Sequence, residues 1–541
     1  MAKQKQLECS WEQQDEHTYR VFIKAEGAVD EAGEETAECI PCQPVSEKTG
    51  NTIVVLSSDC MGEGDEVLGR ALMKGFIYAL TSQEGLPDTV IMYNGGARLP
   101  VEGSESLEDL KLLESQGVEI LTCGTCLNHY GLTEKLSVGG VTNMYVICEK
   151  NAAGRKGCEA MIYLDSAATS YYRPREVAQA VYDAILTMGN AGRGSHASSL
   201  NSARMIYETR CLLNELFHGP GPEQVVFTSN ATEALNIAIQ GLTAPGVRMA
   251  ATAMDHNSVL RPVYRAKERG CSLQILDVDE KGRLSLEKLE ELFQNGVDIF
   301  ACTHASNVTG NLNPLTEIGK LCKKYGVLFL VDASQTAGVF PIDMERDFID
   351  ILCFTGHKGL MGPQGTGGMI VQKSVHLPAF KTGGSGVQSF LKTQPKEMPT
   401  VLEAGTLNGH GIAGLHAALN YILNVGTEQI KRIECQRMRQ FYEGIKHLDA
   451  VKIYGDFSNM ERAPIVALNI GNYDSSAVSD ELSEVYGIQT RPGAHCAPLM
   501  HRALHTEEQG IVRFSFSHFL SEEQVEEAVQ AIKEMTAGEE I

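Results

Sequence analysis

The chain has 541 residues, a formal net charge of −23 at pH 7 and 43% hydrophobic residues. This length allows several domains with large cores, and the acidic balance argues against nucleic acid or an anionic membrane as the main partner. The first residues are polar without an apolar signal region, and no later apolar run is long enough to span a bilayer, so we expect a soluble cytoplasmic protein.

Residues 1–50 are polar and acidic. They contain one convincing strand pattern, Tyr19–Ile23, and a run of glutamates between Glu31 and Glu38. Such a composition buries little apolar surface. We expect a strand followed by a tether.

Residues 51–148 alternate between strand and helix patterns. Strands are expected at 53–56, 89–93 and 118–121, and helices at 66–80 and 106–115. This alternation predicts a small α/β unit with a parallel sheet. Residues 149–160 are short, charged and glycine-containing, which predicts a linker. From 161 to 541 the alternation resumes over a much larger span, with helices expected at 175–188 and 202–217.

The chain contains 15 cysteines, an odd number scattered through a large sequence. This favours reduced thiols over a disulfide framework. Most lie in apolar or helical sequence and are expected to be small buried hydrophobes. Three stand in a special context: Cys123, Cys126 and Cys496.

Asp332 and Lys358 point to a cofactor. Asp332 closes the apolar strand 326–331, and Lys358 follows the next apolar run in Gly356-His357-Lys358. A carboxylate can keep a pyridine nitrogen protonated, and a lysine amine can form a Schiff base. Together they meet the requirements of pyridoxal phosphate.

Other polar residues follow strand patterns. Thr232 begins a helix after the strand 225–227, where helix N–H groups and its hydroxyl suit a phosphate, although an ordinary capping turn explains the same residues. His256 suits ring stacking and proton transfer, or a purely structural role. Asn307 is placed to bind a carboxylate or a ring oxygen. Open α/β sheets bind ligands at such strand ends.

Seven motifs in order resemble the class V aminotransferase superfamily, specifically cysteine desulfurases and selenocysteine lyases. They are Asn230-Ala231-Thr232-Glu233, Asp255-His256, Ser306-Asn307-Val308-Thr309-Gly310, Asp332-Ala333-Ser334-Gln335, Gly356-His357-Lys358, Glu403-Ala404-Gly405-Thr406 and Arg491-Pro492-Gly493-Ala494-His495-Cys496-Ala497. The resemblance covers 161–541. It implies a type I fold for pyridoxal-phosphate enzymes, with a large domain containing a parallel or mixed sheet and a small α+β domain built from both ends of this region. It also implies a homodimer.

The resemblance assigns roles by position. Lys358 would be the Schiff-base lysine, Asp332 the pyridine partner and His256 the stacking residue. The remaining cofactor ligands would be Gln335 at the ring hydroxyl and Ala231, Thr232, Thr355 and His357 at the phosphate, with Thr406 reaching the phosphate of the neighbouring subunit. Asn307 and Arg513 would face the substrate carboxylate.

Cys496 narrows the chemistry. Its thiolate would attack the sulfur of a cofactor-bound cysteine, leaving alanine and a persulfide, and His495 and Arg491 are candidates to favour the thiolate. The short stretch Gly493–Cys496 resembles group II desulfurases, in which an acceptor must come to the cysteine. L-cysteine and L-selenocysteine both remain open as substrates. The alternative is a class V aminotransferase or β-lyase, with Cys496 inert.

Residues 51–148 resemble the DsrE-like domain of selenium-metabolism proteins of the YedF type, through Ser57-Ser58-Asp59, Gly69-Arg70, Gly103-Ser104-Glu105 and Thr142-Asn143-Met144-Tyr145. The strand at Tyr19 would be the remnant of a preceding TusA-like carrier domain. Cys123 and Cys126 have three interpretations: a sulfur or selenium relay, an inert structural pair, or a metal site. Residues 51–148 as a whole are either the acceptor that takes sulfur or selenium from Cys496 or a non-catalytic binding module.

Overall fold

The computed structural model describes residues 8–13, 19–24, 53–61, 66–83, 85–143, 146–147, 161–192 and 194–537. Near the amino terminus, β1 (Glu8–Gln13) and β2 (Tyr19–Lys24) pair antiparallel. The prediction of a single strand here was wrong, because Glu8-Cys-Ser-Trp-Glu-Gln13 shows too little apolar alternation to be recognised without its partner. The expected tether and the linker 149–160 lie outside the described residues.

Residues 53–142 form the predicted parallel α/β unit. Its sheet has the order β3-β4-β5-β6 with every pair parallel. The elements are β3 (Ile53–Leu56), α1 (Glu66–Thr81), β4 (Thr89–Met92), η2 (Asn94–Arg98), α2 (Leu107–Ser115), β5 (Glu119–Cys123), α3 (Gly124–Tyr130), η3 (Thr133–Lys135) and β6 (Gly140–Thr142). Ile77, Val90, Met92 and Leu110 are fully buried in its core.

A seven-stranded sheet dominates the larger region, in the order β10-β9-β11-β12-β13-β14-β8. The pairs from β10 to β13 are parallel, and β14 runs antiparallel to both β13 and β8. The strands are β8 (Val225–Thr228), β9 (Arg248–Thr252), β10 (Ser272–Leu276), β11 (Ile299–Thr303), β12 (Leu328–Asp332), β13 (Ile351–Thr355) and β14 (Gly367–Val371). The mixed sheet agrees with the expected large domain.

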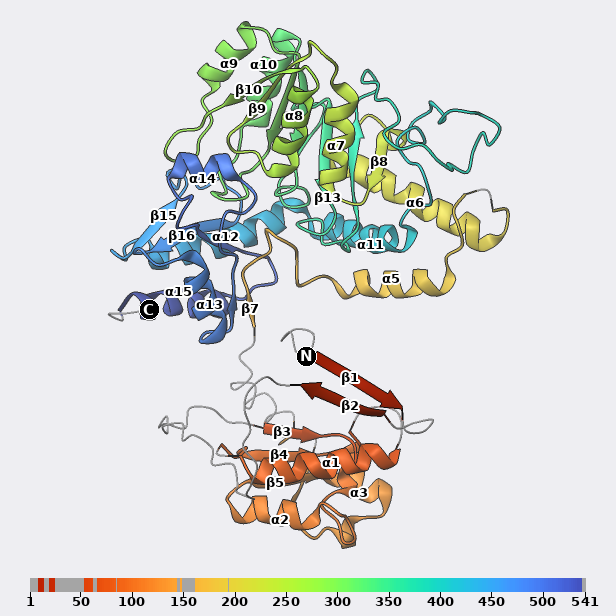
Figure 1. The fold of residues 1–541 in the computed structure, drawn as a ribbon, viewed down its shortest axis with the longest axis vertical. Helices are drawn as coiled ribbons and strands as arrows, with labels where there is room; N and C mark the ends of the chain where they lie inside the picture. The colour runs from red at the N-terminus through yellow and green to blue at the C-terminus, as the bar shows by residue number, and fades with distance from the viewer. Residues whose placement is uncertain are drawn as a thin grey trace.

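Helices cover both faces of this sheet (Figure 1). One face packs on α7 (Ala231–Leu242) and α8 (Asn257–Glu268). The other packs on α6 (Ala197–Leu216), α9 (Leu286–Gln294), α10 (Leu315–Tyr325) and α11 (Gly409–Val425), and α5 (Arg175–Thr187) lies against α11. Because both faces are buried, the central strands read as continuous apolar runs.

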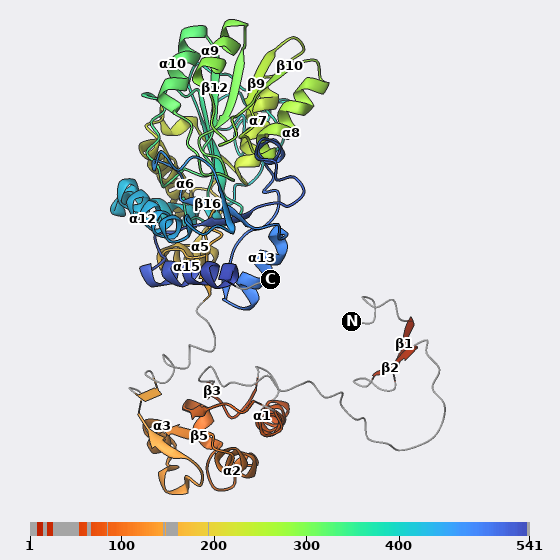
Figure 2. The same cartoon turned by 90° about the vertical axis from the view of Figure 1, so that its left-hand side faces the viewer.

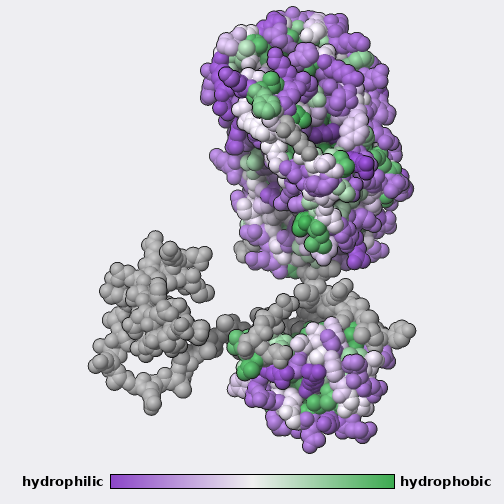
Figure 3. All heavy atoms as spheres, turned by 90° about the vertical axis from the view of Figure 1, so that its right-hand side faces the viewer, coloured by the Kyte–Doolittle hydropathy of each residue, from purple (hydrophilic) through white to green (hydrophobic). Residues whose placement is uncertain are grey.

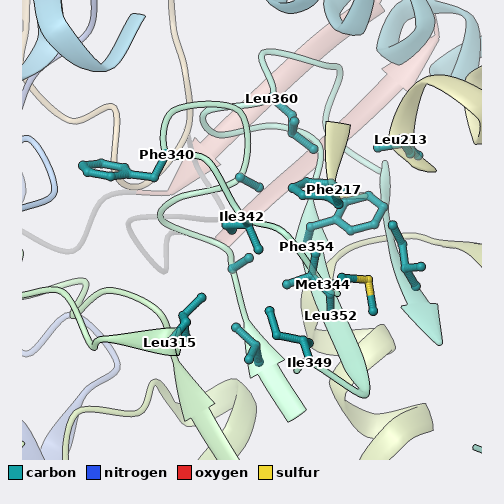
Figure 4. Packing of buried hydrophobic residues seen from close by; sticks show 14 of the residues in the cluster. Leu213, Phe217, Leu315, Phe340, Ile342, Met344, Ile349, Leu352, Phe354 and Leu360 are labelled. Atoms are coloured by element: carbon teal, nitrogen blue, oxygen red, sulfur yellow. The ribbon is translucent and has the colours of Figure 1, made fainter. Parts of the chain in front are cut away.

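Side chains within one strand alternate between these two cores. Leu352 and Phe354 of β13 enter one core, and Ile351 and Cys353 enter the other. Figure 4 shows Phe354 beside Phe217, with the ring centroids 5.7 Å apart. This period of two fixes the register of β13 and so the position of the turn that follows it.

A smaller domain joins both ends of the region. Its sheet β15-β16-β18 is antiparallel, and β7 (Ile162–Tyr163) pairs in parallel with β17 (Ile488–Gln489). Helices α12 and α15 pack together beside it (Figure 2). The remaining bounds are η4 (Pro222–Gln224), α12 (Thr427–Ile445), β15 (Val451–Tyr454), β16 (Ile465–Ile470), α13 (Ser475–Glu484), α14 (Pro498–Leu504), β18 (Val512–Ser515) and α15 (Glu522–Ala537).

One face of the molecule is largely polar among the residues that the structure describes (Figure 3). Hydrophilic residues cover most of the face shown in Figure 3. Within the described ranges, no helix combines the length and the apolar character needed to cross a membrane.

Candidate functional site

A cavity of about 400 Å³ lies where the large and small domains meet. Its walls contain the ends of β11, β12 and β13, the starts of α7 and α8, and loops of the small domain. With one exception, the structure brings together every residue that the sequence predicted for the cofactor and substrate. These residues are Ala231, Thr232, His256, Asn307, Asp332, Gln335, Thr355, His357, Lys358, Cys496 and Arg513.

Lys358 lies in the turn after β13. The pKa of its amine is lowered to about 8, chiefly by burial and next by the charge of Arg513, while the charge of Asp332 opposes the shift. A lysine with this pKa has a far larger neutral fraction near physiological pH than an ordinary lysine, and the neutral amine is the form that reacts with a carbonyl carbon.

Asp332 is the last residue of β12 and is 3% exposed. Its Oδ1 accepts hydrogen bonds from the backbone N–H of Ser334 at 2.9 Å and from the Ser334 hydroxyl at 2.5 Å. These bonds fix the orientation of the carboxylate in the cavity. Nearby, the side-chain amide of Gln335 donates to the Ala167 carbonyl at 3.2 Å.

The helix starts of α7 and α8 lie side by side. The Thr232 and Ser258 hydroxyls are 2.8 Å apart, and Nδ1 of His256 accepts from the Ser258 N–H at 3.1 Å. Opposite them, the Thr355 hydroxyl is buried without a partner among the described residues. Two positive helix ends, the hydroxyls at their starts and the Thr355 hydroxyl form a suitable site for a phosphate.

His256 and His357, two of the histidines that line the cavity, are uncharged near neutral pH. Burial lowers the pKa of His357 to about 4, helped by Lys358, and its Nδ1 lies 3.1 Å from the Thr169 hydroxyl. Burial, followed by the charge of Lys358, also lowers the pKa of His256. A neutral imidazole can stack on a protonated pyridine ring without charge repulsion.

Asp255 is a buried carboxyl for which the sequence suggested no role. It accepts hydrogen bonds from the Thr252 N–H at 2.7 Å, the Thr252 hydroxyl at 2.9 Å and the Thr303 N–H at 2.7 Å. Asp255 therefore ties the end of β9 to the end of β11. Burial raises its pKa to about 7, and the charge of Asp332 adds to the effect.

Asp165 is the main residue that the sequence analysis missed. Its Oδ2 accepts from Arg491 at 2.9 and 2.7 Å, and its Oδ1 accepts from Arg513 at 3.0 Å. Arg513 is 2% exposed and also donates to the Asn307 carbonyl at 2.9 Å, while its Nε has no partner within the described ranges. The only signal of Asp165 in the sequence is its position as an acid directly after a short apolar run, Ile162-Tyr163-Leu164.

Cys496 is exposed on a strained loop. His495 and Cys496 both have left-handed backbones, with φ of 51° and 55°. The Asn307 amide donates to the His495 carbonyl at 2.8 Å, and the Asn257 N–H donates to the Cys496 carbonyl at 2.7 Å. These two bonds stabilise a conformation that non-glycine residues rarely adopt, and so hold the thiol at the cavity.

His495 does not present a free nitrogen to Cys496. Its Nε2 lies 3.0 Å from the Arg491 carbonyl, and its Nδ1 lies 3.4 Å from Nε2 of His501. Burial and the charge of Arg513 lower its pKa well below the usual value. The expected support of the thiolate by His495 is therefore positional, whereas the Arg491 guanidinium lines the same cavity as Cys496.

The exception is Thr406. It is exposed and lines a different cavity of about 880 Å³, together with Arg210 and Glu403. Within one chain it does not reach the cavity that contains Lys358.

The polar character of the main cavity fits pyridoxal phosphate. Asp332 can face a ring nitrogen and two helix starts can face the phosphate. The Thr355 hydroxyl and the side-chain Oδ1 of Asn307, which have no hydrogen-bond partner among the described residues, provide unused hydrogen-bonding groups. Lys358 supplies the reactive amine. The residues present thus match the group in charge and in hydrogen-bonding capacity.

Cys123 and Cys126 lie at the junction of β5 and α3, away from this cavity's residues in the sequence. Cys126 accepts a hydrogen bond from the Asn94 N–H at 3.0 Å. Burial raises the pKa of Cys123, but hydrogen bonds from Cys126 and Thr125 outweigh it, so the net pKa is lowered. Burial raises the pKa of Cys126. In the described part of the chain, no three His, Cys, Asp or Glu residues gather as a metal site would require.

Comparison with known proteins gives one consistent result. The pattern that describes the family "Aminotransferase class-V" matches residues 162–528. The chain is 31% identical over 382 residues to a probable cysteine desulfurase of Methanothermobacter thermautotrophicus, covering 69% of this chain and 94% of the relative. It is 32% identical over 390 residues to another from Pyrococcus abyssi, covering 70% and 94%.

Solved structures show the same fold. The apo cysteine desulfurase of Thermococcus onnurineus superposes with a TM-score of 0.67 at 30% identity, covering 70% of this chain and 96% of that one. The cysteine desulfurase CsdA of Escherichia coli, with an S-sulfonic acid, gives a TM-score of 0.63 at 25% identity over 70% of this chain and 95% of that one.

Proposed function

Because the chain belongs to the class-V aminotransferase family, we propose that it is a pyridoxal-phosphate-dependent cysteine desulfurase that converts L-cysteine to L-alanine. One observation carries the proposal. An exposed cysteine, Cys496, and the amine of Lys358 line the same cavity. An aminotransferase needs the lysine but has no use for the thiol.

Pyridoxal phosphate, when bound, acts as an electron sink that labilises bonds of an attached amino acid. Lys358 would hold it, Asp332 would face its ring nitrogen, His256 would stack on the ring, and Thr232 with the helix starts would hold the phosphate. Arg513 would receive the substrate carboxylate, since its Nε has no partner in the described ranges and its other nitrogens are fixed by Asp165 and Asn307.

Cys496 supplies the acceptor for sulfur. Its thiolate attacks the sulfur of the substrate, a bond forms between the two sulfur atoms, and the bond from that sulfur to the substrate carbon breaks. The released electron pair stays with the carbon skeleton, which takes up protons and leaves as alanine. Lys358, with a pKa of about 8, can both accept and donate a proton near neutral pH.

Sulfur would then pass to the unit formed by residues 53–142. The lowered pKa of Cys123 favours its thiolate, and Cys126 lies three positions away to resolve or share the sulfur. We also propose a homodimer, in which the exposed Thr406 completes the phosphate site of the second copy. Selenocysteine fits the same cavity chemistry, and the two substrates are separated by direct assay.

The test uses the full-length protein with L-cysteine and L-selenocysteine in parallel. We expect alanine from one or both, and a persulfide on the Cys496 peptide in the absence of reductant. Cys496→Ala should abolish both products, whereas Cys435→Ala, which removes a partly buried thiol outside the cavity, should retain them. Alanine formation that survives Cys496→Ala undiminished would favour the β-lyase or aminotransferase reading.

The relay has a separate test. Cys123→Ser/Cys126→Ser should leave the first turnover unchanged and remove the persulfide mass from residues 51–148. If wild-type protein never carries that mass, the relay is wrong while the desulfurase stands.

A further inference from the structure

A second cavity opens beside the catalytic one. Its volume is about 410 Å³, and it lies against the starts of α7 and α8. Cys496, His256 and Thr232 line both cavities. A sulfur atom collected by Cys496 on the inner side is therefore within reach of a group that enters the outer cavity.

The outer cavity is basic. Arg261 and Arg265 line it and stand four positions apart on α8, so they project from the same face of the helix. The opposite face is anchored by the buried side chains of Val259, Val263 and Ala266. No carboxylate lines this cavity, and among the described residues neither arginine forms an ion pair. Two guanidinium groups without an ion pair among the described residues thus line a cavity that also contains the nucleophile, in a chain with a net charge of −23.

The same chain contains a segment of opposite charge. Residues 26–38 hold six carboxylates and no lysine or arginine; the carboxylates are Glu26, Asp30, Glu31, Glu34, Glu35 and Glu38. This segment lies outside the described residues and precedes the unit that carries Cys123 and Cys126. Guanidinium groups bind carboxylates through paired hydrogen bonds, and an array of carboxylates offers them several equivalent partners.

Building on the desulfurase function proposed above, we propose that residues 26–38 dock on Arg261 and Arg265, in the same chain or in a second copy. Docking holds the unit with Cys123 and Cys126 near the outer side of Cys496. Because Arg261 and Arg265 are exposed, salt screens their attraction for carboxylates and the contact releases readily, as repeated delivery requires.

The transfer itself is a thiol exchange. A thiolate of the docked unit attacks the outer sulfur of the Cys496 persulfide, the bond between the two sulfurs of the persulfide breaks, and Cys496 leaves as a thiolate. The acceptor becomes the persulfide. No oxidant or reductant is consumed.

Cross-linking tests the docking directly. In Arg261→Lys/Arg265→Lys full-length protein, a carbodiimide should join the new amines to the tryptic peptide 25–48, which contains all six carboxylates. The native Lys267 lies on the same helix outside the cavity and serves as the internal control. Cross-links to peptide 25–48 that favour the new lysines support the proposal. Cross-links that favour Lys267, or that go to other peptides, overturn it.

A persulfide chase tests the consequence. Protein is loaded with one equivalent of cysteine, and movement of sulfur from Cys496 to the peptide with Cys123 and Cys126 is followed by mass spectrometry. Arg261→Glu/Arg265→Glu should slow this movement at least about tenfold, and Glu31→Arg/Glu34→Arg in the same protein should restore it. Lys267→Glu should behave as wild type.

The two hypotheses fail differently. Wild-type protein that forms neither alanine nor a Cys496 persulfide would overturn the desulfurase and the docking with it. Normal loading of Cys496, followed by transfer at the wild-type rate in Arg261→Glu/Arg265→Glu, would overturn the docking alone.

Discussion

The side-chain amide of Asn307 donates a hydrogen bond to the backbone carbonyl of His495 at 2.8 Å. Asn307 follows β11 in the large domain, and His495 directly precedes the nucleophile in the small domain. One bond thus joins the wall that receives the substrate to the loop that removes its sulfur.

Asn307→Asp tests this bond. The carboxylate cannot donate, and it would face a carbonyl oxygen, so we expect alanine formation to fall by about tenfold or more, equivalent to the loss of ~1.4 kcal/mol. Cofactor absorbance should be retained, and amide exchange at residues 494–497 should become faster. Asn420→Asp is the control, because the Asn420 amide donates hydrogen bonds only to His416 on its own helix among the residues that the structure describes. A rate equal to wild type would show that the loop is held without Asn307.

Asp165→Asn should destabilise the small domain. Arg513 is 2% exposed and would lose its only anionic partner within the described ranges, an effect of about 3 kcal/mol for a buried pair. Urea denaturation followed by the fluorescence of the bound cofactor measures the change. Asp298→Asn breaks an ion pair with Arg248 in which both side chains are over 40% exposed, so it should change stability much less. Equal losses of stability in the two variants would contradict the conclusion that the buried pair of Asp165 and Arg513 stabilises the small domain.

Lys358 should titrate near pH 8 in cofactor-free protein, because burial lowers its pKa from 10.5 to about 8. Competitive labelling with an amine-reactive reagent, read at the Lys358 peptide, measures the midpoint, and unfolded protein provides the reference. Between about pH 8 and pH 10.5 the unfolded chain binds a proton at Lys358 that the native protein has released. The contribution of Lys358 to the free energy of unfolding therefore rises with pH in this interval. A native midpoint equal to the unfolded one would refute the prediction.

Asp255 should impose the opposite pH dependence. Its pKa is raised from 3.8 to about 7, so the native protein binds more protons than the unfolded chain in that interval. The contribution to stability is present in acid and is lost as the pH rises through 7. Asp255→Asn should remove this slope from the free energy of unfolding measured between about pH 5 and pH 8. It should also cost about 1–3 kcal/mol, since an amide cannot accept all three hydrogen bonds. An unchanged slope would mean that other groups produce it.

Sequence alone located most of the site because the cavity lies at strand ends. His256 and Asn307 follow β9 and β11, and Asp332 is the last residue of β12; parallel strands bring their carboxyl ends to one edge of the sheet. Asp165 escaped notice because its two arginine partners are 326 and 348 residues away. No local periodicity encodes such a contact.

Other differences have local causes. Helix α6 begins at Ala197, five residues before its predicted start, because Nδ1 of His196 caps it by accepting from the Ser199 N–H. His495 was expected to favour the Cys496 thiolate, but its ring is not free to do so. Its neighbours occupy both ring nitrogens, and only coordinates show that His501 is one of them.

The pairing of β7 with β17 sets an order on biosynthesis. A ribosome completes Ile162 and Tyr163 more than 300 residues before their partner strand exists, and Asp165 waits still longer for Arg513. Until the chain has passed residue 515, the emerging seven-stranded sheet has no small domain to close its cavity, and Lys358 faces water. Capture of the cofactor is therefore expected to be a late event of maturation, after translation rather than during it.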